Sequence, residues 1–329
     1  MKRREFITLL GGAATWPVEA RAQHRDRMRL IGLLMGYAES DTIVQSYLAA
    51  FRVALARLGW TEGGNLRIEL RWGASDPNRT KTFAKELVEL RPDAILGVTT
   101  GAVSALARET STIPIVFAIV IDPIGNGFAA SLAHPGGNIT GFTVLDSAIG
   151  GKWVDLLKEI APRTERVALL FNPATAPPIQ SLLASIQTAA SSVAVQASAA
   201  PVHAEDEIEG VVAEQARTRG GGLIVMPDPF NRRNRDLIIA LTARYGVPAI
   251  YYARSLAEAG GLIAYSDDYG EGLRLAAGYV DRILNGEKPA DLPLQAATKF
   301  ELVINMKTAK ALGLTVSDKM QLLADEVIE

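Results

Sequence analysis

Short apolar runs alternate with amphipathic segments along the first part of the chain. The strand candidates in this part are residues 29–37, 66–72, 94–98 and 114–121. Between them, apolar side chains recur at helical spacing in residues 41–58, in residues 77–90 and from Gly101 onward. Almost continuously apolar strands interleaved with helices are typical of a parallel sheet that is covered on both faces. This part of the sequence therefore predicts one α/β unit.

The same alternation begins again after residue 150. The second set of strand candidates is 166–172, 193–201, 223–227, 248–252 and 261–266. The second set of helix candidates is 152–160, 179–190, 205–217 and 232–245. The chain is thus predicted to fold as two α/β lobes of similar size, each around its own Rossmann-like parallel sheet.

The C-terminal segments are too few for a third domain. Residues 269–284 form a strongly amphipathic helix that ends at Asn285-Gly286, a helix-ending pair. Two extended stretches, 292–298 and 300–305, and a helix at 307–312 follow. We expect these pieces to complete the first two lobes, so that the chain crosses between them more than once. Two lobes joined by several short crossings make a hinge with a cleft.

The first 22 residues have the pattern of an export signal. Arg3 and Arg4 precede a mildly apolar stretch, residues 7–18, and residues 20–22 match the A-x-A cleavage pattern. The arginine pair resembles a twin-arginine signal, and an ordinary secretion signal is the alternative. The mature chain would begin near Gln23 and would reside in the periplasm.

Composition narrows the class of protein further. The chain has 34 basic and 36 acidic residues, and removing the first 22 residues, which carry a net charge of +2, changes the net charge from −2 to −4. This balance argues against nucleic acid and against an anionic membrane surface as partners. The chain has no cysteine, so it lacks the usual attachment point for a lipid anchor after the signal. We expect a soluble, exported protein without a membrane anchor.

Motifs for catalysis or for a metal are absent from the sequence. The histidines, His24, His134 and His203, do not have metal-ligand spacing, and no H-E-x-x-H, G-x-S-x-G or Walker sequence occurs. Residues 125–130 have a G-x-G-x-x-A form, but they follow the fourth strand, whereas a dinucleotide site follows the first. We therefore expect neither an enzyme nor a cofactor nor a bound metal.

Small polar and aromatic residues gather at the predicted C-terminal ends of the strands, where open parallel sheets bind their ligands. The helix that begins at Gly101 offers free N–H groups to a carboxylate, and Asp122 or Asp228 can balance an ammonium group. The site residues predicted from these strand ends are Tyr37, Thr99, Thr100, Gly101, Asp122, Asn172, Asp228, Tyr252, Tyr265, Ser266 and Asp267.

Two stretches of sequence resemble a known protein family. They are residues 113–141, IPIVFAIVIDPIGNGFAASLAHPGGNITG, and residues 259–314, which begin AGGLIAYSDDYGEGLRLAAGYVDRILNGEKP. Both resemble the substrate-binding proteins of ABC-type importers, a family that includes tryptophan- and tyrosine-binding members. The resemblance implies the type I periplasmic-binding-protein fold, with two lobes, three crossover strands and a ligand in the cleft. The expected division is residues 28–143 plus 266–299 for lobe 1 and residues 144–265 plus 300–329 for lobe 2.

Carried over by position, the resemblance implies ligand contacts that overlap the strand-end set. The implied contacts are the loop from Thr99 to Ala102, Asp122, Phe142, Thr143, Asp228 and the Tyr265-Ser266 pair. Of these, Ala102, Phe142 and Thr143 are not in the strand-end set. The ligand is expected to be a small amphipathic solute, either an amino acid with an aromatic side chain or an aromatic acid or another carboxylate.

The expected function is that of a monomeric periplasmic binding protein that passes this solute to a membrane permease. Two other functions are compatible with the sequence. A binding protein that serves as the input of a membrane sensor would have the same sequence features, and an exported α/β enzyme would need a catalytic constellation that the motif search does not find.

Changing Arg3 and Arg4 to Lys tests the export route. If the twin-arginine pathway reads this signal, the variant precursor accumulates in the cytoplasm, because lysine keeps the charge but loses the guanidinium groups that the receptor reads. Immunoblots of cytoplasmic and periplasmic fractions measure the effect. Export at the wild-type level would favour the general secretion route instead.

Overall fold

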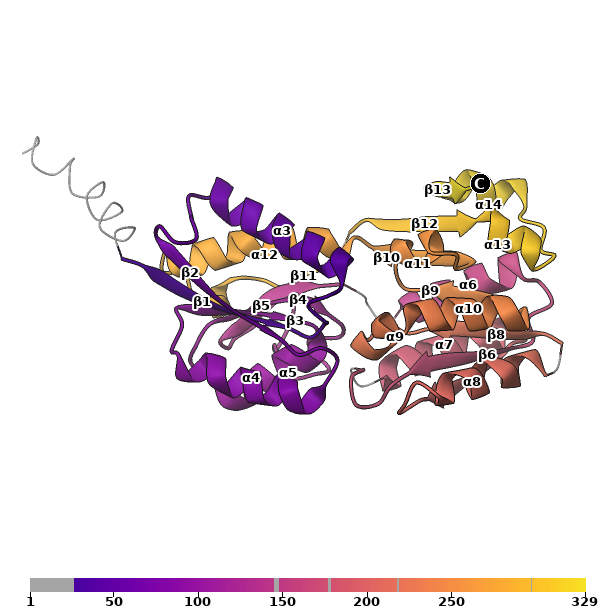
Figure 1. Ribbon diagram of the computed structural model, residues 1–329, viewed down its shortest axis with the longest axis horizontal. Helices are drawn as coiled ribbons and strands as arrows, with labels where there is room; N and C mark the ends of the chain where they lie inside the picture. The colour runs from indigo at the N-terminus through magenta and orange to yellow at the C-terminus, as the bar shows by residue number, and fades with distance from the viewer. Residues whose placement is uncertain (1–26, 145–147, 177–178, 218, 297) are drawn as a thin grey trace, which may run out of the picture.

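The computed structural model describes residues 27–144, 148–176, 179–217, 219–296 and 298–329. The expected export signal, residues 1–22, lies outside these ranges. Two α/β lobes lie side by side, and each contains one sheet (Figure 1). The strand order is β11-β5-β4-β3-β1-β2 in the first sheet and β13-β12-β10-β9-β8-β6-β7 in the second. The predicted fold class is confirmed.

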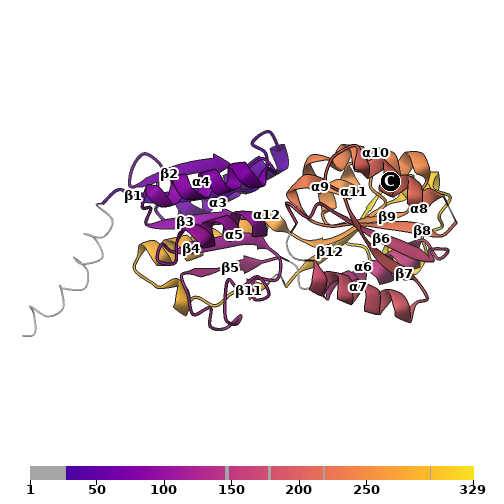
Figure 2. The same ribbon diagram turned by 90° about the horizontal axis from the view of Figure 1, so that it is seen from below.

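The first lobe is a parallel sheet between two layers of helices. Its strands are β1 (Arg29–Met35), β2 (Leu66–Trp72), β3 (Ala94–Val98), β4 (Ile115–Val120), β5 (Ile139–Thr143) and β11 (Gln295–Ala296). On one face lie α3 (Thr42–Arg57) and α12 (Tyr269–Leu284), and on the other lie α4 (Pro77–Glu89) and α5 (Thr100–Glu109) (Figures 1 and 2). A short 3-10 helix, η1 (Pro289–Asp291), precedes β11.

The second lobe repeats this architecture with one antiparallel pair. Its strands are β6 (Arg166–Phe171), β7 (Gln196–Pro201), β8 (Gly221–Val225), β9 (Ala249–Tyr251), β10 (Ile263–Asp267), β12 (Phe300–Asn305) and β13 (Glu326–Ile328). Its helices are α6 (Ile149–Ile160), α7 (Gln180–Ser192), α8 (Glu207–Ala216), α9 (Pro229–Arg233), α10 (Arg235–Tyr245), α11 (Arg254–Glu258), α13 (Met306–Ala311) and α14 (Asp318–Leu323). Strand β12 runs antiparallel to β10. Helices α6 and α7 pack together, as do α8 and α10 on the opposite face (Figure 2).

Several elements differ from the sequence-based prediction. Strand β5 was not predicted, because Gly141 interrupts a short stretch. At this glycine φ is +151° and a Cβ would lie 2.2 Å from the Phe117 carbonyl oxygen, so only glycine lets β5 approach β4. The helix predicted at 232–245 is wrong at its start, since the chain forms α9, turns at Asn234 and then forms α10. Strand β13 and helices α11 and α14 were not predicted either.

The chain passes between the two sheets at three places. It leaves the first sheet after β5, returns from β10 to α12, and leaves again between β11 and β12. The return is abrupt, because β10 ends at Asp267 and α12 begins at Tyr269. Asp268 caps α12 by accepting hydrogen bonds from the N–H groups of Gly270 and Glu271. Such short connections are the usual site of a hinge between lobes.

Asp267 is a buried carboxyl at the middle crossing. Its side chain is 8% exposed, and its Oδ1 has no hydrogen-bond partner among the described residues. Burial, together with the neighbouring charge of Asp268, raises the pKa of Asp267 to about 8. The ordinary value near 3.9 applies to the unfolded chain. Because the folded state binds this proton more tightly, its stability falls as the pH rises from about 4 to about 8.

Replacing Asp267 by Asn is therefore expected to stabilise the protein at neutral pH. The variant avoids the cost of protonating or desolvating the carboxylate, and we expect the free energy of unfolding at pH 7 to rise by about 2 kcal/mol. The gain should shrink toward pH 4. Urea unfolding between pH 4 and pH 8 measures it. Asp76→Asn, which changes an exposed helix cap, is the control and should alter stability by less than about 0.5 kcal/mol at any of these pH values. An equal effect in both variants would contradict the burial argument.

Candidate functional site

Two cavities that share residues lie between the lobes. The inner cavity is small, with a volume of about 10 Å³, and is lined by Tyr37, Thr99, Thr100, Ile119, Ile121, Val144, Thr175, Pro227 and Pro229. The outer cavity is larger, with a volume of about 200 Å³, and is lined by Gly36, Ser75, Asp76, Pro77, Thr80, Lys81, Thr99, Gly101, Ala102, Ser104, Ala105, Arg108, Ala174, Thr175, Ala176 and Pro229. Both cavities lie at the C-terminal ends of strands from the two sheets, where the sequence predicts a ligand site.

The wall from the first lobe is built around the start of α5. Thr99 has φ of +91°, and its Oγ1 accepts a long hydrogen bond (3.4 Å) from the N–H of Ala102. Gly36 packs directly against it, since a Cβ at Gly36 would lie 2.2 Å from the Thr99 Oγ1. Thr100 is tied to the end of β4, because its Oγ1 accepts a hydrogen bond from the Ile121 N–H at 3.2 Å. These contacts direct the α5 N-terminus toward the cavities, as the sequence predicts.

The wall from the second lobe is organised by Asp228. Its carboxylate accepts hydrogen bonds from the N–H groups of Asn172 and Asn231, at 3.2 and 2.9 Å, and from the Thr175 hydroxyl at 3.2 Å. Burial raises the pKa of Asp228 to about 6, although these hydrogen bonds act in the opposite direction. Asn172 in turn accepts a hydrogen bond from the Ala174 N–H at 2.8 Å. Asp228 thus holds the loop after β6 against the loop after β8, and pairing with a ligand ammonium stays a prediction.

A buried ion pair joins the two lobes beside the cavities. In α9, Arg232 donates from Nε and Nη2 to the two carboxylate oxygens of Asp41, at 2.9 and 3.1 Å. Arg235 adds a third hydrogen bond to Asp41 at 3.2 Å. Burial opposes ionisation of Asp41, but the hydrogen bonds and charge of Arg232 hold its pKa below the ordinary value. A second contact between the lobes is the hydrogen bond from the Ser75 hydroxyl to the Pro229 carbonyl, at 2.8 Å.

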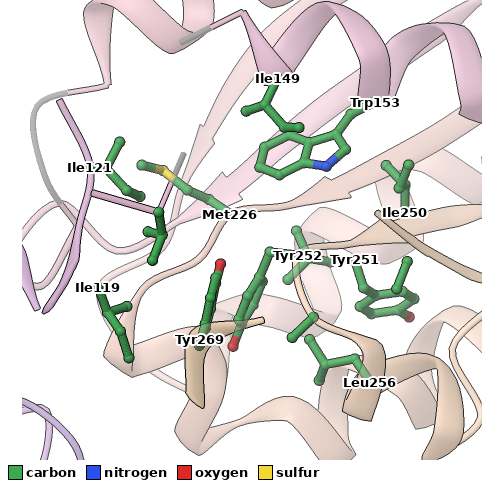
Figure 3. Packing of buried hydrophobic residues seen from close by; sticks show 14 of the residues in the cluster. Ile119, Ile121, Ile149, Trp153, Met226, Ile250, Tyr251, Tyr252, Leu256 and Tyr269 are labelled. Carbon is green, nitrogen blue, oxygen red and sulfur yellow. The ribbon is translucent and has the colours of Figure 1, made fainter. Parts of the chain in front are cut away.

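Tyrosine rings fill the space next to this ion pair. Tyr252 and Tyr269 stack with ring centroids 6.3 Å apart, and their hydroxyls point in opposite directions (Figure 3). The guanidinium carbon of Arg232 lies 5.8 Å from the ring centroid of Tyr37. The hydroxyls of Tyr252 and Tyr269 are buried and find no hydrogen-bond partner among the described residues. Burial raises the pKa of Tyr37, Tyr252 and Tyr269 above the ordinary value, so all three are neutral phenols at physiological pH.

The remaining predicted residues lie around the hinge or at the cleft edge. Phe142, Thr143 and Asp267 line a separate cavity at the crossings, and Ser266 lines another beside Asp267. Tyr265 stacks on Phe300, with centroids 5.6 Å apart, on the second sheet.

Asp122 is half-buried at the edge of the cleft. It accepts hydrogen bonds from the Gly125 N–H at 2.9 Å and from the Ser181 hydroxyl of the other lobe at 3.5 Å. The structure therefore brings Tyr37, Thr99, Thr100, Gly101 and Ala102 to the two cavities, and Asn172, Asp228 and Tyr252 behind their walls.

Sequence reasoning missed several residues of the cleft. Asp41 and Arg232 were each expected only to begin a predicted helix. Ser75 and Thr175 also went unnoticed, because they stand in loops whose positions depend on the other lobe. An N-cap aspartate near the end of the first strand was the available signal for Asp41, but nothing in the sequence pairs it with an arginine 191 positions later.

The described residues offer neither a metal-binding cluster nor a membrane-spanning helix. Among the described residues, no group of three or more His, Cys, Asp or Glu side chains could hold a metal ion. None of the described helices is both long and apolar enough to cross a membrane.

Comparisons with known proteins agree with this geometry. A curated relative, the tyrosine-binding protein of Clostridioides difficile (strain R20291), is 25% identical over 280 residues, which cover 84% of this chain and 78% of that protein. An ABC domain from Streptococcus pneumonia, solved in complex with L-Trp, superimposes with a TM-score of 0.83 at 24% identity, covering 91% of this chain and 99% of that one. A conserved domain protein of Vibrio cholerae superimposes with a TM-score of 0.84 at 25% identity, covering 92% of this chain and all of that one.

The family model described as "ABC transporter substrate binding protein" matches residues 39–328, nearly the whole described chain. It spans both lobes and all three crossings, so the match concerns the complete two-lobed unit. This is a family of binding proteins for small molecules and not of enzymes. The chain therefore belongs to the ABC transporter substrate-binding proteins and has the type I periplasmic-binding-protein fold.

Proposed function

We propose that this chain is the solute-binding component of an ABC importer. In this proposal the protein works in the periplasm as a monomer, after removal of residues 1–22, and delivers its solute to a membrane permease. The observation that carries the proposal is the pair of cavities enclosed by strand ends of both lobes, in a chain whose family binds transported substrates.

The proposed ligand is a small amphipathic solute with an aromatic side chain. The inner cavity offers an apolar wall made by Ile119, Ile121 and Pro227 together with the ring of Tyr37. Hydroxyls and the start of α5 lie at the junction with the outer cavity, where a polar group of the ligand would bind. The relatives that are described with tyrosine or L-Trp support an aromatic amino acid as the first candidate.

Most of the predicted site residues fit this arrangement in two groups. Residues that line the cavities would touch the ligand: Tyr37, Thr99, Thr100, Gly101 and Ala102. A second group would act by holding the walls or the hinge: Asp122, Phe142, Thr143, Asn172, Asp228, Tyr252, Ser266 and Asp267. Tyr265 packs on Phe300 and would act through the second sheet alone.

The proposed mechanism is closure of the two lobes about the crossings. Thr99 and Thr175 come from different lobes and line both cavities, so a ligand touches both walls only when the lobes are closed. A ligand that makes contacts in only one of two states shifts the population toward that state. Opening would expose the cavities and the ion pair of Asp41 with Arg232 to water.

A thermal-shift screen of amino acids and aromatic acids tests the function. A ligand present at 100 times its dissociation constant adds about 2.7 kcal/mol to the free energy of unfolding, which raises the melting temperature by roughly 5 °C. We expect at least one aromatic compound to reach this shift and sugars to leave the melting temperature unchanged. If no amino acid or organic acid stabilises the protein, the proposed function is wrong.

Small-angle X-ray scattering with the ligand from that screen tests the closure. We expect the unliganded protein to sample open forms and the ligand to reduce the radius of gyration, since both lobes then enclose it. The control is a compound that produces no thermal shift. An unchanged radius of gyration with a ligand of demonstrated affinity would show that binding does not require closure.

A further inference from the structure

One nitrogen of the Arg232 guanidinium makes no hydrogen bond to a described residue. Its Nε and Nη2 are bonded to Asp41, but its Nη1 is buried and has no partner within the described part of the chain. Arg232 is 2% exposed, so solvent at the protein surface does not reach this nitrogen. Buried charged donors that lack a partner are costly and rare, and they point to a missing water, ion or ligand.

Arg232 lies next to the wall of the inner cavity. Its guanidinium carbon is 5.8 Å from the ring centroid of Tyr37, which lines that cavity, and Pro229, three residues earlier in α9, lines both cavities. The hydroxyl of Tyr252 is a second buried group that finds no hydrogen-bond partner among the described residues. An acceptor on a ligand would supply the partner that these buried donors lack.

Three carboxylates of the cleft, by contrast, already accept hydrogen bonds from protein groups, and a fourth is neutral. Asp41 accepts from two arginines, and Asp228 accepts from two backbone N–H groups and one hydroxyl. Asp122 accepts from a backbone N–H and a serine, and Asp267 is a neutral acid at pH 7 because burial raises its pKa to about 8. Arg235 pairs with Asp41 at 3.2 Å and with the exposed Asp236 at 3.7 Å, so the buried charges in this cluster are those of Arg232 and Asp41.

The entrance to the site also carries positively charged side chains. Lys81 and Arg108 line the outer cavity from α4 and α5, and neither makes an ion pair with another described residue. Asp76, the acidic residue of the same lining, already accepts hydrogen bonds from the N–H groups of Asn78 and Arg79. Exposed cations at the mouth of a cleft raise the local concentration of anions and speed their entry.

We propose that Arg232 binds the carboxylate of the ligand through Nη1, with the Tyr252 hydroxyl as a second donor, so that the ligand is an aromatic carboxylate whose ammonium group is dispensable. The inference rests on the proposed binding function and identifies which part of the ligand the cleft recognises. It ranks aromatic acids without an amino group as ligands equal to the corresponding amino acids. It also assigns the determining contact to the second lobe, on the wall opposite to α5.

Isothermal titration calorimetry with three probes tests this ranking. Phenylalanine, 3-phenylpropanoate and phenethylamine share one phenylethyl body, and the second lacks the ammonium group while the third lacks the carboxylate. We expect 3-phenylpropanoate to bind within about 3-fold of phenylalanine, and phenethylamine to bind at least about 30-fold more weakly, which is the usual effect of losing a charge-assisted hydrogen bond. Absence of 3-phenylpropanoate binding overturns the inference. The proposed function fails separately, when nothing in the wider screen binds.

Arg232→Gln tests the assigned residue, with Arg233→Gln as the matched control. Arg233 is the next residue in α9 and is exposed. We expect Arg232→Gln to weaken 3-phenylpropanoate binding about 30-fold and to erase the preference over phenethylamine, and Arg233→Gln to change the affinity less than about 2-fold. Wild-type affinity in Arg232→Gln would mean that Nη1 bonds only to water, and would overturn the inference.

The double variant Asp41→Asn with Arg232→Gln separates ligand binding from the ion pair. Arg232→Gln alone leaves the Asp41 carboxylate with one arginine fewer, which by itself could disturb closure. Neutralising both residues removes that charge. If Arg232 holds the ligand, the double variant binds 3-phenylpropanoate as weakly as the single one. Recovery of wild-type affinity in the double variant would assign the effect to the ion pair and contradict the proposal.

Discussion

The carboxylate of Asp41 is the point at which the two lobes depend on each other. It caps α3 by accepting hydrogen bonds from the N–H groups of Ile43 and Val44, and it pairs with Arg232 of α9 across the cleft. One side chain thus fixes a helix of the first lobe and the position of the second. A buried ion pair adds little net stability, because desolvation offsets the Coulombic attraction, but breaking one partner costs about 3–5 kcal/mol. The pair therefore favours one relative position of the two lobes, and it adds little to the net free energy of unfolding.

The parallel sheets explain why the cleft lies where it does. Both sheets direct the C-terminal ends of their strands toward the cleft. The loops after β1, β3, β4, β6 and β8 therefore line its cavities. Short-range hydrogen bonds then make each wall rigid. Thr100 ties α5 to the end of β4, and Asp228 ties the loop after β6 to that after β8. In the proposed closure, rigid walls and short crossings confine the motion to the hinge.

The interior of the cleft combines apolar packing with unused hydrogen-bonding capacity. The Tyr252 and Tyr269 rings are buried and stack with centroids 6.3 Å apart, yet their hydroxyls and one nitrogen of Arg232 are unpaired among the described residues. A protein that needed only stability would have satisfied or removed these groups, since each costs about 1–3 kcal/mol when left alone. A binding protein gains from them, because the ligand supplies the missing partner and closure becomes more favourable only when it is present.

The sequence by itself determined the architecture, and the tertiary structure decided the chemistry of the cleft. Apolar runs such as Ala94–Val98 and Ile115–Val120 predict strands because a sheet covered on both faces must be apolar throughout, and they predicted the two α/β lobes correctly. Strand β5 was not predicted because it is short and contains Gly141. The reason for this glycine is the close approach of Phe117, which is visible only in the folded structure. The site shows the same limit. Local patterns located Tyr37 and Thr99 at strand ends, but Asp41 and Arg232 meet only because two lobes close on each other, and no local pattern records a contact between residues 191 positions apart.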